Sequence, residues 1–87
     1  MTKFKDAKLE FPREWEFRVI IAEAARPAAE EGIAALLAGR SVAVSQGERS
    51  RNGSYGTIVI RMEVRSHEEL DALSLDLQKV PGVKFLL

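Results

Sequence analysis

The sequence predicts a single α+β domain, in which a four-stranded antiparallel sheet is covered on one face by two helices. Three observations lead to this fold class. Residues 15–22 and 55–65 alternate apolar and polar side chains with the period of a half-buried strand. Two other segments repeat apolar residues with the period of a helix. Each helical pattern lies between two strand patterns, so the predicted order is strand, helix, strand, strand, helix, strand.

The composition sets the size and the class of the protein. Its 87 residues are enough for one hydrophobic core, and its 13 basic residues balance 13 acidic ones, so no overall field attracts phosphate groups. The chain has no cysteine, which excludes disulfides and thiolate catalysis and is compatible with a reducing compartment. We find neither a signal-peptide pattern nor a run of about 20 apolar residues that could cross a membrane. We therefore expect a cytoplasmic protein without a membrane partner.

The first half of the chain contains one strand and one helix. We expect residues 1–14 to form an extended arm and residues 15–87 to form the domain. The first helix begins near Pro27, whose missing N–H costs nothing in a first turn, and ends near Gly39. Gly32 lowers the intrinsic stability of this helix by about 1 kcal/mol relative to alanine, so the helix depends on packing. The core-facing residues of the first strand are Trp15, Phe17, Val19 and Ile21.

A hairpin follows, with strands over residues 40–48 and 55–65 joined by a polar turn. Asn52-Gly53 suits the positive φ angles of such a turn. Right-handed crossovers place the first and third strands in the centre of the sheet. The core face of the third strand consists of Ile58, Ile60, Met62 and Val64.

The second helix has a clear start signal. Ser66 and Glu69 have the spacing of a capping box, in which the serine hydroxyl accepts a hydrogen bond from the Glu69 N–H. Pro81-Gly82 ends the helix, and residues 83–87 form the last strand.

The sheet face opposite the helices is the first candidate functional surface. On the alternation, Ile20, Val59 and Leu86 form an apolar row across it. Exposed apolar residues in a contiguous group commonly mark a contact site. We therefore predict a surface for an unknown protein partner or for a second copy in a homodimer, made of Arg18, Ile20, Val59, Arg61, Glu63, Lys84 and Leu86.

The polar turn is the second candidate, through Ser50, Asn52, Gly53 and Tyr55. A structural interpretation explains most of it, because a tight turn needs Gly53, and serine and asparagine side chains satisfy its backbone. A recognition loop is the alternative interpretation.

An RNA-binding domain using the open sheet face is the second-ranked function. Such domains stack bases on aromatic residues of the two central strands. Tyr55-Gly56-Thr57 resembles part of their third-strand signature, but Thr57 stands where the second stacking aromatic would be. One aromatic residue and no net basic charge rank nucleic-acid binding below protein binding.

Residues with catalytic potential are few. His67 is the only histidine, and we expect it to be solvated in the first turn of a helix. Glu68 and Glu69 beside it do not complete a metal or acid–base site, and no phosphate-binding loop or dinucleotide fingerprint occurs. The sequence therefore predicts no enzyme, no metal and no cofactor.

Four segments together resemble the YbeD-like family of small bacterial proteins: Leu9 to Pro12, Ser50 to Thr57, SHEELDAL from Ser66, and the ending PGVKFLL. The resemblance covers nearly the whole chain and implies a ferredoxin-like βαββαβ sandwich, similar to the ACT regulatory domains. The family is described as being of unknown function. ACT domains that bind amino acids have a glycine after the first strand, whereas residues 22–27 contain none, so we do not expect a small-molecule ligand of that kind. The resemblance thus implies a small regulatory or protein-interaction module.

Overall fold

The computed structural model describes residues 10–87, so residues 1–9 of the predicted arm lie outside the described part. The first strand begins two residues earlier than predicted and takes in Arg13 and Glu14. The elements are β1 (Arg13–Ala22), the 3₁₀ helix η1 (Glu23–Ala25), α2 (Arg26–Leu36), β2 (Val42–Arg49), β3 (Tyr55–Val64), α3 (His67–Gln78) and β4 (Val83–Leu86).

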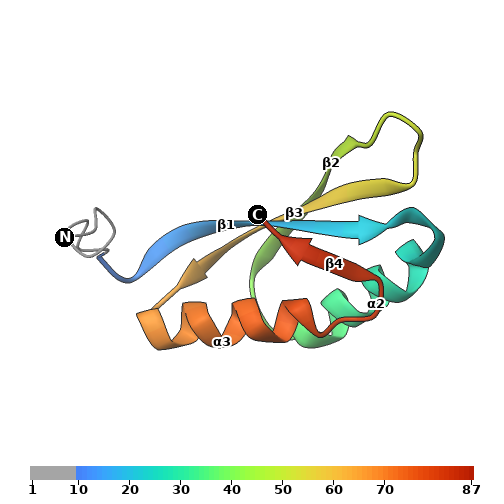
Figure 1. Cartoon of the computed structure of the whole chain (residues 1–87). Coiled ribbons are helices and arrows are strands. Elements are labelled where there is room, and N and C mark those ends of the chain that lie inside the picture. Colours follow the sequence, from blue (N-terminus) through green and yellow to red (C-terminus); the bar gives the residue numbers. More distant parts are fainter. Residues whose placement is uncertain (1–9) are drawn as a thin grey trace.

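The four strands form one antiparallel sheet in the order β2-β3-β1-β4, with α2 and α3 on one face (Figure 1). The predicted α+β fold class and the central positions of the first and third strands are confirmed. Among residues 10–87, no helix is long and apolar enough to span a membrane.

The core lies between the two central strands and the two helices. β1 and β3 pair without interruption from Arg13 opposite Val64 to Ala22 opposite Tyr55. Because side chains alternate along each strand, one face of this ladder is apolar and becomes buried under the helices. The buried side chains include Phe17, Val19 and Ile21 of β1, Ile58, Ile60, Met62 and Val64 of β3, and Ile33, Leu70, Leu73 and Leu77 of the helices.

Gly32 has a packing role that the sequence did not reveal. A Cβ atom at this position would lie 2.7 Å from Cγ1 of Val80, which is buried just after α3. The missing side chain therefore lets α2 approach the end of α3 closely. This close approach explains why a weak helix former occupies the middle of α2.

The predicted N-cap of α3 is confirmed, because Ser66 Oγ accepts a hydrogen bond of 3.0 Å from the Glu69 N–H. The Glu69 carboxylate reaches back one residue further than a capping box requires and accepts from the Arg65 N–H at 2.7 Å. It also pairs with Arg40 at 2.9 Å, which ties α3 to the loop after α2. The Arg65 N–H and then Arg40 hold the pKa of Glu69 below its ordinary value.

Strand β4 corrects one sequence prediction. Ile20 lies opposite Phe85, but its neighbour Ile21 lies opposite Val83, so β4 has one extra residue at this point. Such a β-bulge shifts the alternation by one position. Leu86 therefore packs against the core, and Phe85 is exposed on the open face. The predicted apolar row was wrong in placing Leu86 on that face.

The other edge strand, β2, is covered less well by the helices. Val42 is half-buried, whereas Val44 is 52 % exposed beside α2. A groove of about 400 Å³ separates this part of β2 from α2, and Ile33, Leu37 and Ile58 line its inner side. The predicted common direction of Val42 and Val44 holds, because both line this groove.

Candidate functional site

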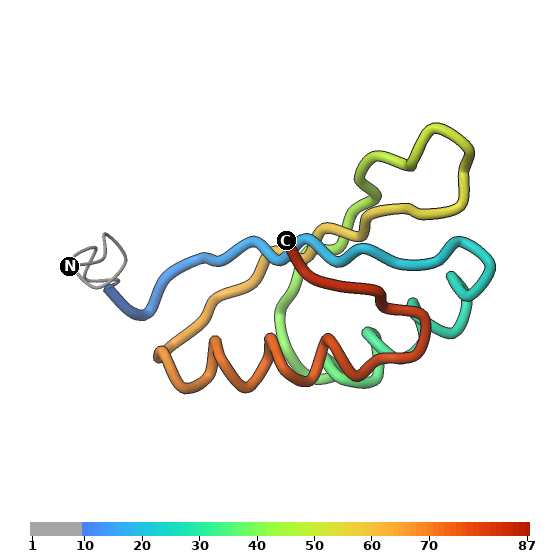
Figure 2. Tube along the Cα trace, in the orientation of Figure 1, coloured from blue at the N-terminus to red at the C-terminus, as the bar shows by residue number. Residues whose placement is uncertain are grey.

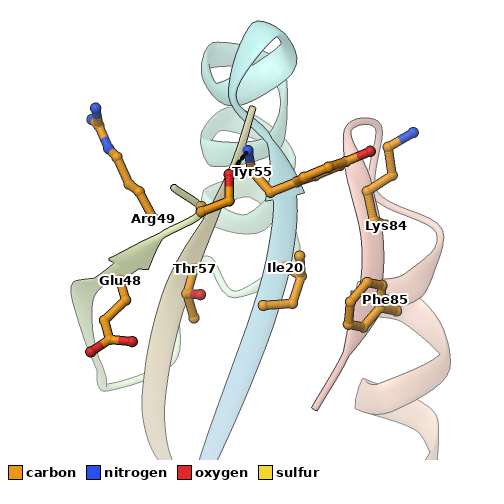
Figure 3. A pocket seen from close by; sticks show the side chains of 9 residues that line it. Ile20, Glu48, Arg49, Tyr55, Thr57, Lys84 and Phe85 are labelled. Carbon is orange, nitrogen blue, oxygen red and sulfur yellow. Dashed lines mark hydrogen bonds between the residues drawn. The ribbon is translucent and has the colours of Figure 1, made fainter. Parts of the chain in front are cut away.

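A shallow depression of about 690 Å³ lies on the open face of the sheet, next to the turn between β2 and β3 (Figure 3). The trace in Figure 2 shows this turn at the same end of the sheet as η1. The depression brings together Ile20 and Lys84 of the predicted surface with Ser50 and Tyr55 of the predicted turn. The two candidate sites therefore meet in one place. The full lining is Ile20, Glu48, Arg49, Ser50, Tyr55, Gly56, Thr57, Lys84 and Phe85.

Three apolar or aromatic side chains line the depression, and each comes from a different strand. Ile20 of β1 is half-buried, while Tyr55 of β3 is 45 % exposed and Phe85 of β4 is 51 % exposed. In Figure 3 the Tyr55 ring extends across the sheet toward Lys84, with Ile20 and Phe85 beside each other below it. The site thus offers an apolar floor with a phenol ring at one rim.

The turn itself is closed by its own side chains. Ser50 Oγ accepts from the Tyr55 N–H at 3.0 Å and donates to Asn52 Oδ1 at 3.1 Å. Asn52 Oδ1 also accepts from the Ser54 N–H at 3.0 Å, and Gly53 adopts φ 76°. These contacts fit the structural interpretation of Ser50, Asn52 and Gly53. Of the four predicted turn residues, Tyr55 directs a large side chain over the depression.

An ion pair under the turn fixes its position. Arg26 donates to both carboxylate oxygens of Glu23, with N–O distances of 2.7 and 2.6 Å. The Glu23 N–H donates to the Ser54 carbonyl at 2.9 Å, and Arg26 also binds Gln46 of β2. The bidentate bond from Arg26 holds the pKa of Glu23 below its ordinary value. Arg26 of the ion pair therefore links α2 to β2, and the Glu23 backbone links η1 to the turn at Ser54.

The rest of the predicted surface lies away from the depression. Arg18, Val59 and Arg61 line a neighbouring hollow toward β2. There the carboxylate of Glu16 is shared by Arg18 at 2.9 Å and Arg61 at 3.1 Å. Exposed pairs of this kind add little to stability. The predicted Glu63 is more distant still, in a hollow at the start of α3.

Charge is distributed unevenly although the chain is neutral overall. The end of the open face near the turn has Arg49, Arg51 and Lys84, with Glu48 as the acidic residue of the depression. Within residues 10–87, Lys84 has no carboxylate at ion-pair distance, and Arg49 is 3.5 Å from a Glu23 carboxylate that Arg26 already binds. The two helices have five exposed carboxylates, and others are exposed on the strands at Glu14 and Glu63. Those of the helices are Glu30, Glu31, Glu68, Asp71 and Asp76.

His67 is exposed in the first turn of α3. Its ring meets that of Phe11 edge-on, with 5.6 Å between the two ring centroids. In the described part of the chain, no three His, Cys, Asp or Glu side chains lie together in a way that could hold a metal ion.

Sequence reasoning missed Phe85, Thr57 and Glu48 as lining residues. Alternation could not reveal that Phe85 is on the open face. Regular alternation places Val83 and Phe85 on the same side of β4, and that pair is a good pattern for a core face. Arg49 is the first residue of the turn that the sequence predicts over residues 49–55.

Three comparisons place the chain among known proteins. A family described as "Protein of unknown function (DUF493)" matches residues 6–87. A UPF0250 protein of Shewanella woodyi is 34 % identical over 89 residues, which cover 99 % of this chain and 97 % of that protein. Two solution structures of protein HP0495 from Helicobacter pylori have TM-scores of 0.75 and 0.69 at 19 % identity. They cover 92 % and 88 % of this chain and 86 % and 87 % of theirs, and they show a shared fold.

Proposed function

This chain belongs to the family of proteins of unknown function DUF493, and we propose that it is a protein-interaction domain that docks a partner in the depression around Ile20, Tyr55 and Phe85. Membership confirms the predicted resemblance to the YbeD-like proteins. The family description names no activity, so the proposal is built on the geometry of the open face.

The observation behind the proposal is the grouping of exposed apolar side chains. Tyr55 and Phe85 keep about half of their surface in water, although aromatic rings of this size gain free energy when they are buried. Together with Ile20 they come from three strands, so their grouping is a property of the folded sheet. Groups of this kind usually mark contact sites, and aromatic residues are enriched at the centres of protein interfaces.

The support beneath the site also favours docking. The turn is closed by Ser50 and Asn52, and Glu23 and Arg26 hold it against η1 and α2. A site that is already ordered loses little conformational entropy when a partner binds. The proposal involves no catalytic step. We expect the protein to act in the cytoplasm by binding its partner and so regulating it.

Site-specific photo-cross-linking tests this proposal. A photoreactive phenylalanine analogue replaces Phe85 in one variant and Leu75 in another, because Leu75 is 57 % exposed on α3 at the helical side. We expect a discrete protein adduct from position 85, weakened by Tyr55→Ala, and none from position 75. An adduct of twice the chain's mass would identify a second copy as the partner. Equal adducts from both positions, or none from position 85 in cells of the source organism, would contradict the proposal.

RNA binding is the second candidate, because the bulge in β4 adds an aromatic that the sequence did not predict on the open face. Tyr55 and Phe85 now form a pair of exposed rings next to Lys84 and Arg49. Rings beside basic side chains are the usual platform for single-stranded nucleic acid. Titration with oligouridine at two salt concentrations tests this function. Micromolar affinity that falls steeply with salt and disappears in Tyr55→Ala would favour RNA over a protein partner.

A further inference from the structure

We infer that the segment docked in the depression is acidic and apolar: a short stretch of the partner protein in which a glutamate or aspartate adjoins a large apolar residue. The inference rests on the proposed function and adds the chemistry of the partner to it.

The size of the depression limits the occupant to a few side chains. Its volume of about 690 Å³ lies within the range of roughly 300–1,000 Å³ found for sites that take small ligands. Ile20 and Phe85, which lie opposite each other on β1 and β4, offer an apolar floor for one large group above the sheet. A short linear segment therefore fits the site better than a broad, flat protein face.

The charges around the floor select an acidic group. Lys84 is exposed and has no ion-pair partner among the described residues, and the one carboxylate near Arg49 is bound by Arg26. A partner that covers Lys84 is favoured when it supplies negative charge, because a cation removed from water without a counter-charge costs free energy. A carboxylate on the partner meets this requirement.

The arrangement in Figure 3 also sets the orientation of the segment. Lys84 rises on the β4 side of the Tyr55 ring, whereas Glu48 lies on the β2 side and points away from it. The partner's carboxylate therefore belongs on the β4 side, near Lys84, with the apolar residue over Ile20 and Phe85. On the β2 side Glu48 and Arg49 carry opposite charges and leave no net charge, so one acidic residue beside an apolar one suits the site better than an acidic run.

Glu48 also favours a peptide over RNA as the occupant. A nucleic-acid backbone has a negative charge at every nucleotide, whereas Glu48 offsets Arg49 on the β2 side and leaves Lys84 as the net positive charge of the lining. A peptide can place its single carboxylate at Lys84 and leave the β2 side uncharged.

Peptide pools that differ at one position test the inference. Each pool displays peptides of about seven residues, long enough to fill the depression, with random large apolar residues beside a central glutamate, glutamine or lysine. We expect the glutamate pool to be enriched most and its best peptide to bind about tenfold more tightly than the matched glutamine peptide. This ratio should fall when salt is added, because the ion pair is partly exposed.

Three variants locate the binding site. Lys84→Gln should remove the difference between the matched glutamate and glutamine peptides while leaving the affinity for the glutamine peptide unchanged. Phe85→Ala should weaken both peptides. Lys79→Gln is the control, because Lys79 is an exposed lysine at the end of α3 on the helical side, and it should change neither affinity.

Two results would overturn the inference. Equal affinity for glutamate and glutamine peptides at this site would remove the acidic requirement and leave the proposed function standing. Absence of binding from all three pools at about 1 mM would also overturn it, while cross-linking from position 85 would still decide the proposed function separately. Oligouridine included as a competitor extends the test, and stronger binding of it than of any peptide would overturn the inference in favour of RNA.

Discussion

The carboxylate of Glu23 lies directly over the backbone of Gly56, so close that a methyl group on Gly56 would overlap Oε2. Glu23 belongs to η1 and Gly56 to β3, and the same methyl group would lie 2.8 Å from Arg26 Nη2. Gly56 is thus the residue that makes room for the ion pair under the binding-site turn.

Gly56→Ala should therefore destabilise the protein, by roughly 1–3 kcal/mol, because the ion pair must move to admit the methyl group. The free energy of unfolding in urea measures this cost. The matched control is the same substitution in a Glu23→Ala background, where the Arg26 side chain loses its partner and can move aside, so the cost should fall. A cost of Gly56→Ala that is the same in both backgrounds would show that crowding by Glu23 is not its cause.

Acid should weaken the fold through Glu23 and Glu69. Both carboxyls have pKa values lowered in the folded state, Glu23 chiefly by Arg26 and Glu69 chiefly by the Arg65 N–H. A lowered folded pKa stabilises the protein above the unfolded pKa of about 4.3, and this stabilisation is lost as the pH falls through the folded value. The free energy of unfolding should thus decline below about pH 4.5, and Glu23→Gln should flatten the decline.

The difference between wild type and Glu23→Gln should shrink as the pH is lowered from about 6 to about 2, because both side chains are then uncharged. A second variant, Glu69→Gln, should flatten another part of the profile, and the two effects should add, since the two carboxylates share no partner. Parallel profiles for wild type and both variants would contradict the assignment.

The effect of Gly32→Ala on the free energy of unfolding should be opposite in sign with valine and with alanine at position 80. Alanine improves helix propensity by about 1 kcal/mol, but a Cβ atom 2.7 Å from Val80 Cγ1 overpacks the contact at a cost of roughly 1–3 kcal/mol. We expect a net loss of stability in the wild type and a gain in a Val80→Ala background. Thermal or urea unfolding of the four proteins of this cycle measures both values, and a gain in both backgrounds would argue against the close contact.

The bulge in β4 predicts opposite behaviour for two neighbouring residues. Leu86→Ala should cost roughly 1–3 kcal/mol, because the side chain packs partly against the core. Phe85→Ala should cost less than about 1 kcal/mol, because half of its ring is already in water. Urea unfolding compares the two variants. A larger loss of stability from Phe85→Ala would indicate that Phe85, and not Leu86, faces the core, as regular alternation predicts.

The elements that could be predicted are those with a strong local pattern. The alternation of β1 and β3 fixed both core faces, and the spacing of Ser66 and Glu69 located the start of α3. β4 was harder because Val83, Phe85, Leu86 and Leu87 offer apolar residues in both phases. Which of these apolar residues are buried depends on how β4 pairs with β1. The pairing partners, Ile20 and Ile21, are far away in the sequence.

The candidate site was predictable in its parts but not as a whole. Ile20, Tyr55 and Lys84 were each identified, yet they belong to segments separated by about thirty residues, and sequence spacing does not report their distance in space. The supporting ion pair between Glu23 and Arg26 was also missed, because its role depends on the absence of a side chain at Gly56.

Within residues 10–87, the carboxylates of α2 and α3 and the cations Lys84 and Arg49 near the turn contribute a dipole with its positive end at the turn. A uniform distribution of the same charges would leave the protein in the flow-through of any ion-exchange column. The dipole should instead allow weak retention on cationic and anionic resins alike, with the molecule turned in opposite directions on the two surfaces.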